Sequence, residues 1–237
     1  MSNKEQNKTE KIEYFKNFFY KKEEIYVNED NDEYVKNFGK QWRDYNSTQI
    51  DSLNDFTVSY DYLNKVLFNN IAYIKGKNVL EIGCGAGRFT EHLVKYADEC
   101  VSVDLSTAIF YNISKNIKNL KLIKADLNKL IPNKKFDVVI CRGVLQHTPS
   151  PNKSIIKLFD FIDTDGHIFF DYYKRPKLGY FHPKYLIWRN IIPKILKYEK
   201  FESLLNRNIK KLLYYYKIIK KIFFNLEFIA DLIIPIW

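Results

Sequence analysis

The stretch from residue 79 to residue 105 constrains the fold most, because two apolar strands flank a glycine-rich turn and a helix within it. Gly83, Gly85 and Gly87 let the chain turn tightly and let a ligand approach the backbone closely. The second strand ends in Asp104, 21 residues after Gly83. This order of elements forms a crevice for an adenosine-containing cofactor.

The spacing of the glycines separates cofactor classes. A dinucleotide site follows the pattern G-x-G-x-x-G or G-x-G-x-x-A, and Arg88 stands where that last small residue belongs. A Walker phosphate loop requires Gly-Lys-Ser or Gly-Lys-Thr, which this chain lacks. Glu81 lies two residues before Gly83. A carboxylate beside backbone N–H groups suits a ligand that carries an ammonium or a sulfonium, and it would repel a pyrophosphate.

Two acids at strand ends match the other parts of such a ligand. Asp104 can accept hydrogen bonds from both hydroxyls of a ribose. A third strand ends in Asp126, which can accept from the exocyclic amine of adenine, with Leu127 against the ring. Simpler interpretations stay open: the glycines as a tight turn, Asp104 as a helix cap, and Asp126 as a turn residue before Asn128.

Taken together, five segments in order resemble the class I, S-adenosylmethionine-dependent methyltransferases, and within them the small-molecule, methyltransferase type 11-like branch. The resemblance covers about residues 38–173. The matching segments are the glycine-rich motif at 79–90, the ribose acid Asp104, Ala125-Asp126-Leu127, the segment 143–149 after the fourth strand, and a lead-in at 38–45.

The resemblance implies S-adenosyl-L-methionine as the cofactor and gives each matching residue a role. The methionine half is expected at Glu81, Gly83, Gly85 and Gly87, the ribose at Asp104 with Leu105 beside it, the adenine at Asp126 and Leu127, and the sulfonium near Arg142 and Gly143. No metal site is expected, because Cys84, Cys100 and Cys141 lack the spacing of metal ligands.

The reaction that the resemblance implies is methyl transfer to an oxygen or nitrogen of a small-molecule, glycan-precursor or lipid-like acceptor. His147 is the candidate catalytic base, because a neutral imidazole can remove a proton from a hydroxyl near pH 7. The alternative, slightly favoured, is that His147 braces the loop before Thr148. DNA-base methylation is disfavoured, because Cys141-Arg142-Gly143-Val144 replaces the Asn/Asp-Pro-Pro-aromatic turn typical of those enzymes.

Charge divides the chain in two. Residues 174–237 hold 14 Lys and Arg against 4 Asp and Glu, whereas residues 1–173 hold 24 of each. A basic, amphipathic helix in the C-terminal part could contact anionic membrane or RNA, or pack with a solvated face. An RNA methyltransferase and an inactive cofactor-binding or membrane-surface module therefore remain alternatives, with RNA the less favoured partner.

The pattern of apolar residues predicts a doubly wound, mainly parallel α/β sheet with a basic helical C-terminal segment. We expect a helical lead-in at 1–75, the cofactor-binding core at 76–173, and the basic extension, or a truncated insertion, at 174–237. The expected helices include one through Ile12, Phe15, Phe18 and Phe19, one at 55–73, and one at 155–162, followed by a turn at 163–166 and a strand at 167–173. The terminal strand pair of the family is not found after residue 173.

Without a secretory signal or a spanning segment, we expect a cytoplasmic protein, with peripheral contact at the inner membrane surface as an option.

Overall fold

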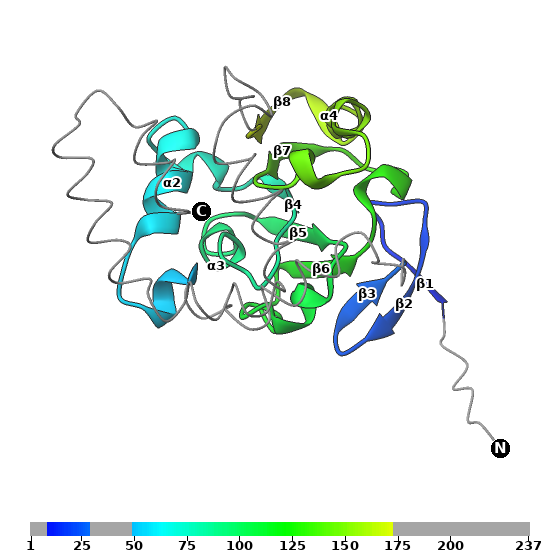
Figure 1. Ribbon diagram of the computed structural model, residues 1–237, viewed down its shortest axis with the longest axis horizontal. Coiled ribbons are helices and arrows are strands. Elements are labelled where there is room, and N and C mark those ends of the chain that lie inside the picture. The colour runs from blue at the N-terminus through cyan, green and yellow to red at the C-terminus, as the bar shows by residue number, and fades with distance from the viewer. Residues whose placement is uncertain (1–8, 29–48, 173–237) are drawn as a thin grey trace, which may run out of the picture. The chain divides into compact units, whose positions relative to one another are not determined.

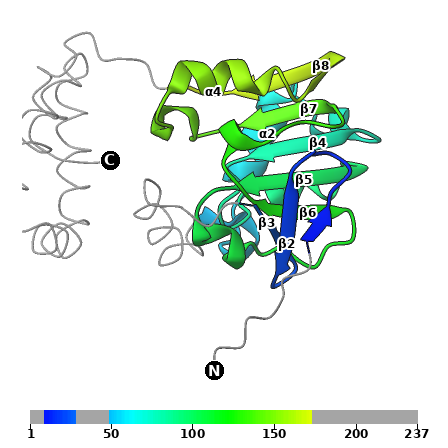
Figure 2. The ribbon, with the colours of Figure 1, turned by 90° about the vertical axis from the view of Figure 1, so that its right-hand side faces the viewer.

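Parallel strands form the centre of an eight-stranded sheet in the computed structural model, which describes residues 9–28 and 49–172 (Figure 1). Five of the strands that pair in parallel are β4 (Asn78–Ile82), β5 (Glu99–Asp104), β6 (Leu120–Lys124), β7 (Phe136–Cys141) and β8 (Ile162–Phe170). They lie in the order β6-β5-β4-β7-β8 (Figure 2). The order reverses at β4, and ligands of open α/β sheets bind outside the carboxyl ends of the strands at such a point.

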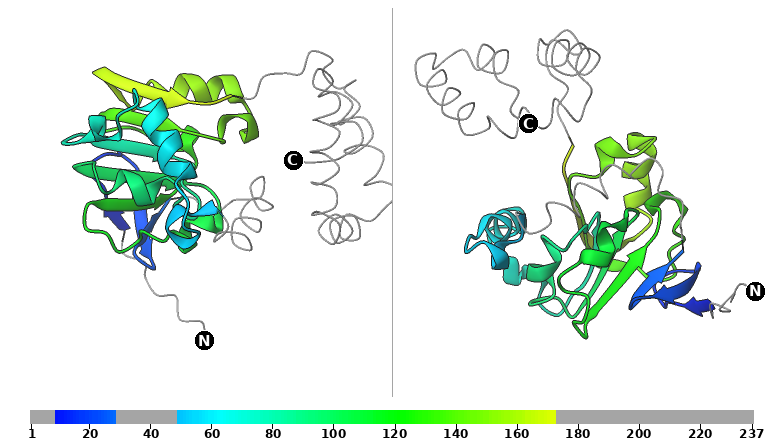
Figure 3. Two further views of the ribbon diagram at one scale, coloured as in Figure 1. Left: turned by 90° about the vertical axis from the view of Figure 1, so that its left-hand side faces the viewer. Right: turned by 60° about the horizontal axis from the view of Figure 1, so that its bottom comes forward.

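Both faces of the sheet are covered, as a parallel sheet requires. Successive side chains of β4 point to opposite faces. Val79 packs with Leu63 of α2 (Val58–Val66), whereas Leu80 packs with Leu158 of α4 (Pro151–Leu158). Figure 3 shows α2 in cyan and α4 in yellow-green on opposite sides of the strands. The doubly wound, mainly parallel fold is therefore confirmed.

Short helices connect the strands. The α-helix α3 (Thr90–Leu93) follows the glycine-rich turn, and the remaining segments are the 3-10 helices η3 (Asp51–Leu53), η4 (Ile71–Ile74), η5 (Thr107–Tyr111), η6 (Leu127–Lys129) and η7 (Leu145–His147). The helix expected at 55–73 is present as α2 and η4, which are separate elements. Along the described ranges, no helix is long and apolar enough to cross a membrane.

The prediction of a helix through Ile12, Phe15, Phe18 and Phe19 is wrong, whereas the later part of the lead-in contains α2 and η4. The N-terminal residues form β1 (Thr9–Lys11), β2 (Phe18–Lys22) and β3 (Ile25–Val27) instead. The first two strands are antiparallel to their neighbours, and β3 joins β6 in parallel, with Tyr26 opposite Ile123. Phe15 and Phe19 are buried in the core against the sheet. Pairing with a distant strand edge decided this structure, and no local periodicity reports such an edge.

The boundaries around the last strand also differ from the prediction. The helix begins at Pro151, because proline is well tolerated in the first turn of a helix, and it ends at Leu158. The turn expected at 163–166 is part of β8. A β-bulge between Phe136 and Val138 accommodates the irregular pairing there. Three predictions fall outside the described residues: the lead-in segment 38–45, the basic helix at 174–237 and the absence of the terminal strand pair.

Candidate functional site

The glycine turn, residues 83–87, leaves β4 at the carboxyl end of the strand. Gly83 and Gly87 have φ angles of +83° and +101°, a region that favours glycine. A Cβ on Gly87 would stand 2.6 Å from Asn112 Oδ1, and one on Gly83 would collide with Val144. These positions therefore require glycine for two reasons, backbone conformation and lack of space. The contact with Val144 also places the segment after β7 against the glycine turn.

Asp104 lies at the end of β5 and contacts the glycine turn directly. Its Oδ2 accepts the backbone N–H of Gly85 at 2.8 Å, and its Oδ1 accepts the N–H and the hydroxyl of Ser106, both at 2.7 Å. Burial raises the pKa of Asp104, while the hydrogen bonds from Ser106 and Gly85 act in the opposite direction. Ser106, not Asp104, is the N-cap of η5. The interpretation of Asp104 as the helix cap is therefore wrong.

Glu81 lies beneath the glycine turn, fully buried between β5 and α3. Its Oε2 accepts hydrogen bonds from the hydroxyls of Thr90 and Ser102, both at 2.7 Å. Its Oε1 is buried and makes no hydrogen bond among the described residues. Burial raises the pKa of Glu81 to about 7. One acceptor atom thus remains unused below the turn in which a positively charged ligand was expected.

Asp126, which follows β6, forms a hydrogen bond within the turn that it begins. Asp126 is the N-cap of η6, and its Oδ1 accepts the backbone N–H of Asn128 at 2.9 Å. Leu127 is buried in the core, and Leu105 is buried at the end of β5. The simpler interpretation of Asp126 as a turn residue therefore describes its contacts, and its expected role toward adenine stays a prediction.

Arg142 and Gly143 follow β7 and are joined to the end of β8. Asp171 accepts from Arg142 Nε at 3.2 Å and from the backbone N–H of Gly143 at 2.6 Å. The guanidinium carbon of Arg142 stands 3.4 Å from the centre of the Tyr62 ring. A cavity of about 200 Å³ opens here between α2, β7 and β8, with Tyr62 and Arg142 among its lining residues.

His147, the candidate base, is exposed at the end of η7. Its backbone N–H donates to the carbonyl of Val144 at 2.9 Å. Because Val144 lies against Gly83, the loop that carries His147 borders the glycine turn. This placement agrees with either role that the sequence left open, a base near the reacting atoms or a brace of the loop.

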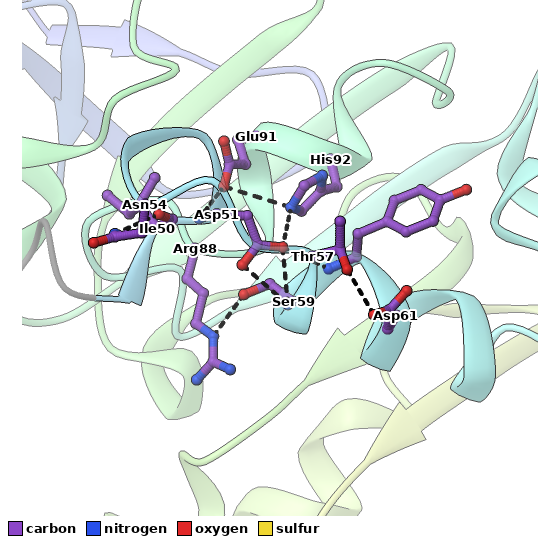
Figure 4. Close-up of polar contacts among 10 residues, drawn as sticks. Ile50, Asp51, Asn54, Thr57, Ser59, Asp61, Arg88, Glu91 and His92 are labelled. Carbon is purple, nitrogen blue, oxygen red and sulfur yellow. Dashed lines mark hydrogen bonds and ion pairs between the residues drawn. The ribbon is translucent and has the colours of Figure 1, made fainter.

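A buried cluster of Asp51, Glu91 and His92 was missed by sequence reasoning (Figure 4). Asp51 Oδ2 stands 3.1 Å from His92 Nε2, and Glu91 Oε1 stands 3.4 Å from the same nitrogen. The ligand atoms lie within 4.8 Å of one another, which is close enough to hold a metal ion. Asp51 Oδ2, however, already accepts the backbone N–H groups of Ser59 and Tyr60, both at 2.9 Å. Hydrogen bonds within the protein therefore explain why the Asp51 carboxylate is buried, without a metal ion.

This cluster fastens the start of α2 to α3, directly after the glycine turn. Arg88 adds a further contact, because its Nε donates to Ser59 Oγ at 2.8 Å (Figure 4). No pattern in the sequence joins these residues, since Asp51 and His92 lie 41 positions apart. The sequence showed that Arg88 is unusual at the end of the glycine pattern, and the structure shows that Arg88 binds the start of α2.

Comparison with known proteins gives the region a family. A family model described as a methyltransferase domain matches residues 80–170. The ubiquinone biosynthesis O-methyltransferase of Coxiella burnetii is 27% identical over 120 residues, which cover 46% of this chain and 49% of that protein. The protein of the same name from Acinetobacter baumannii is 24% identical over 114 residues, 45% of this chain and 48% of its own length. This chain thus spans about half the length of these relatives.

A solved structure of similar fold is the N-methyltransferase NodS from Bradyrhizobium japonicum WM9 in complex with S-adenosyl-l-homocysteine. It is 21% identical, covers 47% of this chain and 58% of its own, and has a TM-score of 0.42. The segment matched by the family model contains the glycine turn and Asp104. Residues 80–170 are thus similar to methyltransferase domains.

Proposed function

We propose that this protein transfers a methyl group from S-adenosylmethionine to an oxygen of a small-molecule acceptor. The observation that carries the proposal is the hydrogen bond between Gly85 and Asp104, which joins the carboxyl ends of β4 and β5. It fixes a carboxylate beside a turn whose backbone comes close to any ligand above it. The bound cofactor supplies an activated methyl group, so the main task of the protein is positioning, worth up to about 7–11 kcal/mol.

The residues around the turn fit this cofactor. Val144 and Asn112 already occupy the space that a Cβ on Gly83 or Gly87 would fill, so these positions admit only glycine, whose backbone a ligand can approach closely. Asp104 accepts from the ribose hydroxyls, because each carboxylate oxygen has two lone pairs. In its ionised form, Glu81 supplies negative charge close to the turn, and its buried Oε1 has no hydrogen-bond partner among the described residues. Leu105, Asp126 and Leu127 border the adenine side, and Arg142 with Gly143 the side of the sulfonium.

Transfer to oxygen is supported by the names of the curated relatives, which are O-methyltransferases. A hydroxyl is a poor nucleophile unless its proton is removed, and a base contributes about 10²–10⁴-fold to such a step. The loop that carries His147 borders the turn through Val144, and His147 is the side chain we propose for this step. Nitrogen as the receiving atom is the second option.

The location of the protein in the cell and its macromolecular partners are part of the same proposal. We place it in the cytoplasm, with peripheral membrane contact through residues 174–237, whose 14 basic residues suit anionic lipid. RNA is the competing partner for this segment, and DNA is not a partner in our proposal. Binding to RNA that falls steeply with salt, together with no binding to anionic liposomes, would reverse this preference.

Calorimetric titration of the full chain with S-adenosylmethionine and S-adenosylhomocysteine tests the proposal. We expect micromolar binding, a loss of about tenfold or more in Asp104→Asn, and no binding of NAD. Lys118→Gln is the matched control, because Lys118 is exposed at the opposite, amino-terminal side of β6. A folded protein that binds neither methionine compound would exclude methyl transfer.

A further inference from the structure

Two arginines flank one aromatic ring at the carboxyl edge of the sheet. The guanidinium carbons of Arg88 and Arg142 stand 5.1 and 5.3 Å from the centre of the Phe89 ring. Arg142 also covers the ring of Tyr62, whose centre lies 5.6 Å from that of Phe89. Guanidinium groups stacked on aromatic faces are held in a fixed orientation, which favours recognition of a planar or tetrahedral anion.

The positive charge of this pair is only partly matched. Arg88 donates to the neutral oxygens of Ser59 and Gln49, at 2.8 and 3.2 Å. Arg142 is paired with Asp171 through Nε alone, and within the described ranges its two terminal nitrogens make no hydrogen bond. Burial, and then the charge of Arg142, lower the pKa of Arg88, while the charge of Asp51 acts in the opposite direction. Two like charges thus share this edge, and an incoming anion would relieve their repulsion.

The cavity beside Arg142 has the size of one ring. Its volume is about 200 Å³, and a cavity of about 150 Å³ is known to hold benzene. Apolar side chains form most of its wall, among them Val66, Ile140 and Phe170. Arg142 supplies the charged group of the wall, and Tyr62 adds an aromatic ring with a hydroxyl. A small apolar pocket with one fixed charged group is the usual form of a specific small-molecule site.

We infer that this cavity receives the acceptor, and that the acceptor is a ring-sized apolar compound with an anionic group, a carboxylate or a phosphate monoester, held by Arg142 with support from Arg88. This inference rests on the proposed methyl transfer and adds the substrate class. A terminal guanidinium edge can bind both oxygens of such an anion at once. An anionic acceptor also offsets the charge that two arginines and a cationic cofactor would place together.

The test uses the full chain saturated with S-adenosylhomocysteine and three probes of nearly equal shape. Benzoate, phenyl phosphate and neutral benzamide are titrated by calorimetry or by ligand-observed NMR. We expect one of the two anions to bind at least about tenfold more tightly than benzamide, and the better anion identifies the group. In Arg142→Gln this preference should fall to about onefold, and Arg142→Lys should keep part of it. Lys118→Gln should leave it unchanged.

The inference is overturned if benzamide binds as tightly as both anions, or if neither anion binds at millimolar concentration. These comparisons use the unaltered chain, so they hold even if an arginine variant fails to fold. The proposed function fails separately, when S-adenosylhomocysteine itself does not bind. A preference for anions that survives in Arg142→Gln would also count against the inference, because the charge would then come from another residue.

Discussion

Arg88 Nε donates to Ser59 Oγ at 2.8 Å, and this bond links the residue after the glycine turn to the start of α2. The turn and the helix that covers it are therefore not independent. A second bond from Arg88, to Gln49, extends the link to the segment before η3. Contacts of this kind hold α2 and the segment before η3 in place relative to the glycine turn, near which the cofactor is expected.

Replacing Arg88 with methionine removes both bonds and keeps an unbranched side chain that reaches the position of Nε. We expect the free energy of unfolding to fall by about 1–2 kcal/mol, as for the loss of hydrogen bonds to a partly buried charged group. Urea denaturation measures the change. Lys95→Met, at an exposed position close to α3, is the control and should change stability by less than about 0.5 kcal/mol. Equal effects of the two substitutions would mean that Arg88 does not hold α2.

The buried Asp51 should be far more sensitive than an exposed acid in the neighbouring helix. Asp51→Ala removes the acceptor of two backbone N–H groups and the partner of His92, so we expect a loss of about 3 kcal/mol. Asp61→Ala, which loses one exposed bond from Thr57, should cost about 0.5 kcal/mol or less. Chemical denaturation decides between them. If Asp51→Ala cost no more than Asp61→Ala, the cluster in Figure 4 would not stabilise the fold.

Two glycine-to-alanine substitutions test the glycine turn, because both positions have a positive φ angle. Gly87 and Gly76 both have positive φ, at +101° and +72°, but a Cβ on Gly76 meets no atom within 4 Å. Gly76→Ala should therefore cost about 1 kcal/mol from backbone strain alone. Gly87→Ala should cost about 2 kcal/mol or more, because its Cβ also collides with Asn112, and should weaken binding of S-adenosylhomocysteine at least tenfold. Similar results for both variants would refute the steric role of Asn112.

Glu81 should make the stability of the protein depend on pH. Its pKa in the folded protein is raised by burial to about 7, above the ordinary value of 4.5, so the unfolded chain releases the proton first as the pH rises. The stabilising contribution is therefore complete below about pH 4.5 and is lost as the pH rises through about 7, by roughly 3 kcal/mol in total.

The variant Glu81→Gln keeps a neutral, hydrogen-bonding side chain and has no such proton to lose. Relative to the unaltered protein, it should gain stability as the pH rises from about 5 to about 8. Denaturation of both proteins across this range provides the measurement. Stability curves that stay parallel would show that Glu81 is ionised throughout.

Sequence reasoning found the parts of this protein that are encoded locally. The strands β4 to β7 are short apolar runs, and the glycine turn is a spacing pattern, so both could be predicted from neighbouring residues. Asp104 was found for the same reason, because its place at a strand end follows from the pattern. The chemistry of a carboxylate beside a glycine turn then indicated the class of ligand.

What could not be predicted depends on residues far apart in the chain. The contact between Asp51 and His92 spans 41 positions, and the pairing of β3 with β6 spans almost a hundred. Asp126 differs, because the sequence motif identified the residue but could not show that its carboxylate accepts a hydrogen bond from Asn128, two residues away. A pattern names a residue type at a place, whereas hydrogen bonding decides which of its atoms remain available.

The pairing of β3 with β6 has a consequence for the solubility of the family-matched region. An unpaired strand at the edge of a sheet presents a row of backbone donors and acceptors that recruits other chains. Here the first described residues occupy that row beside β6. A fragment cut to the family-matched segment 80–170 would lose this protection and should self-associate, so the N-terminal strands guard the domain against aggregation.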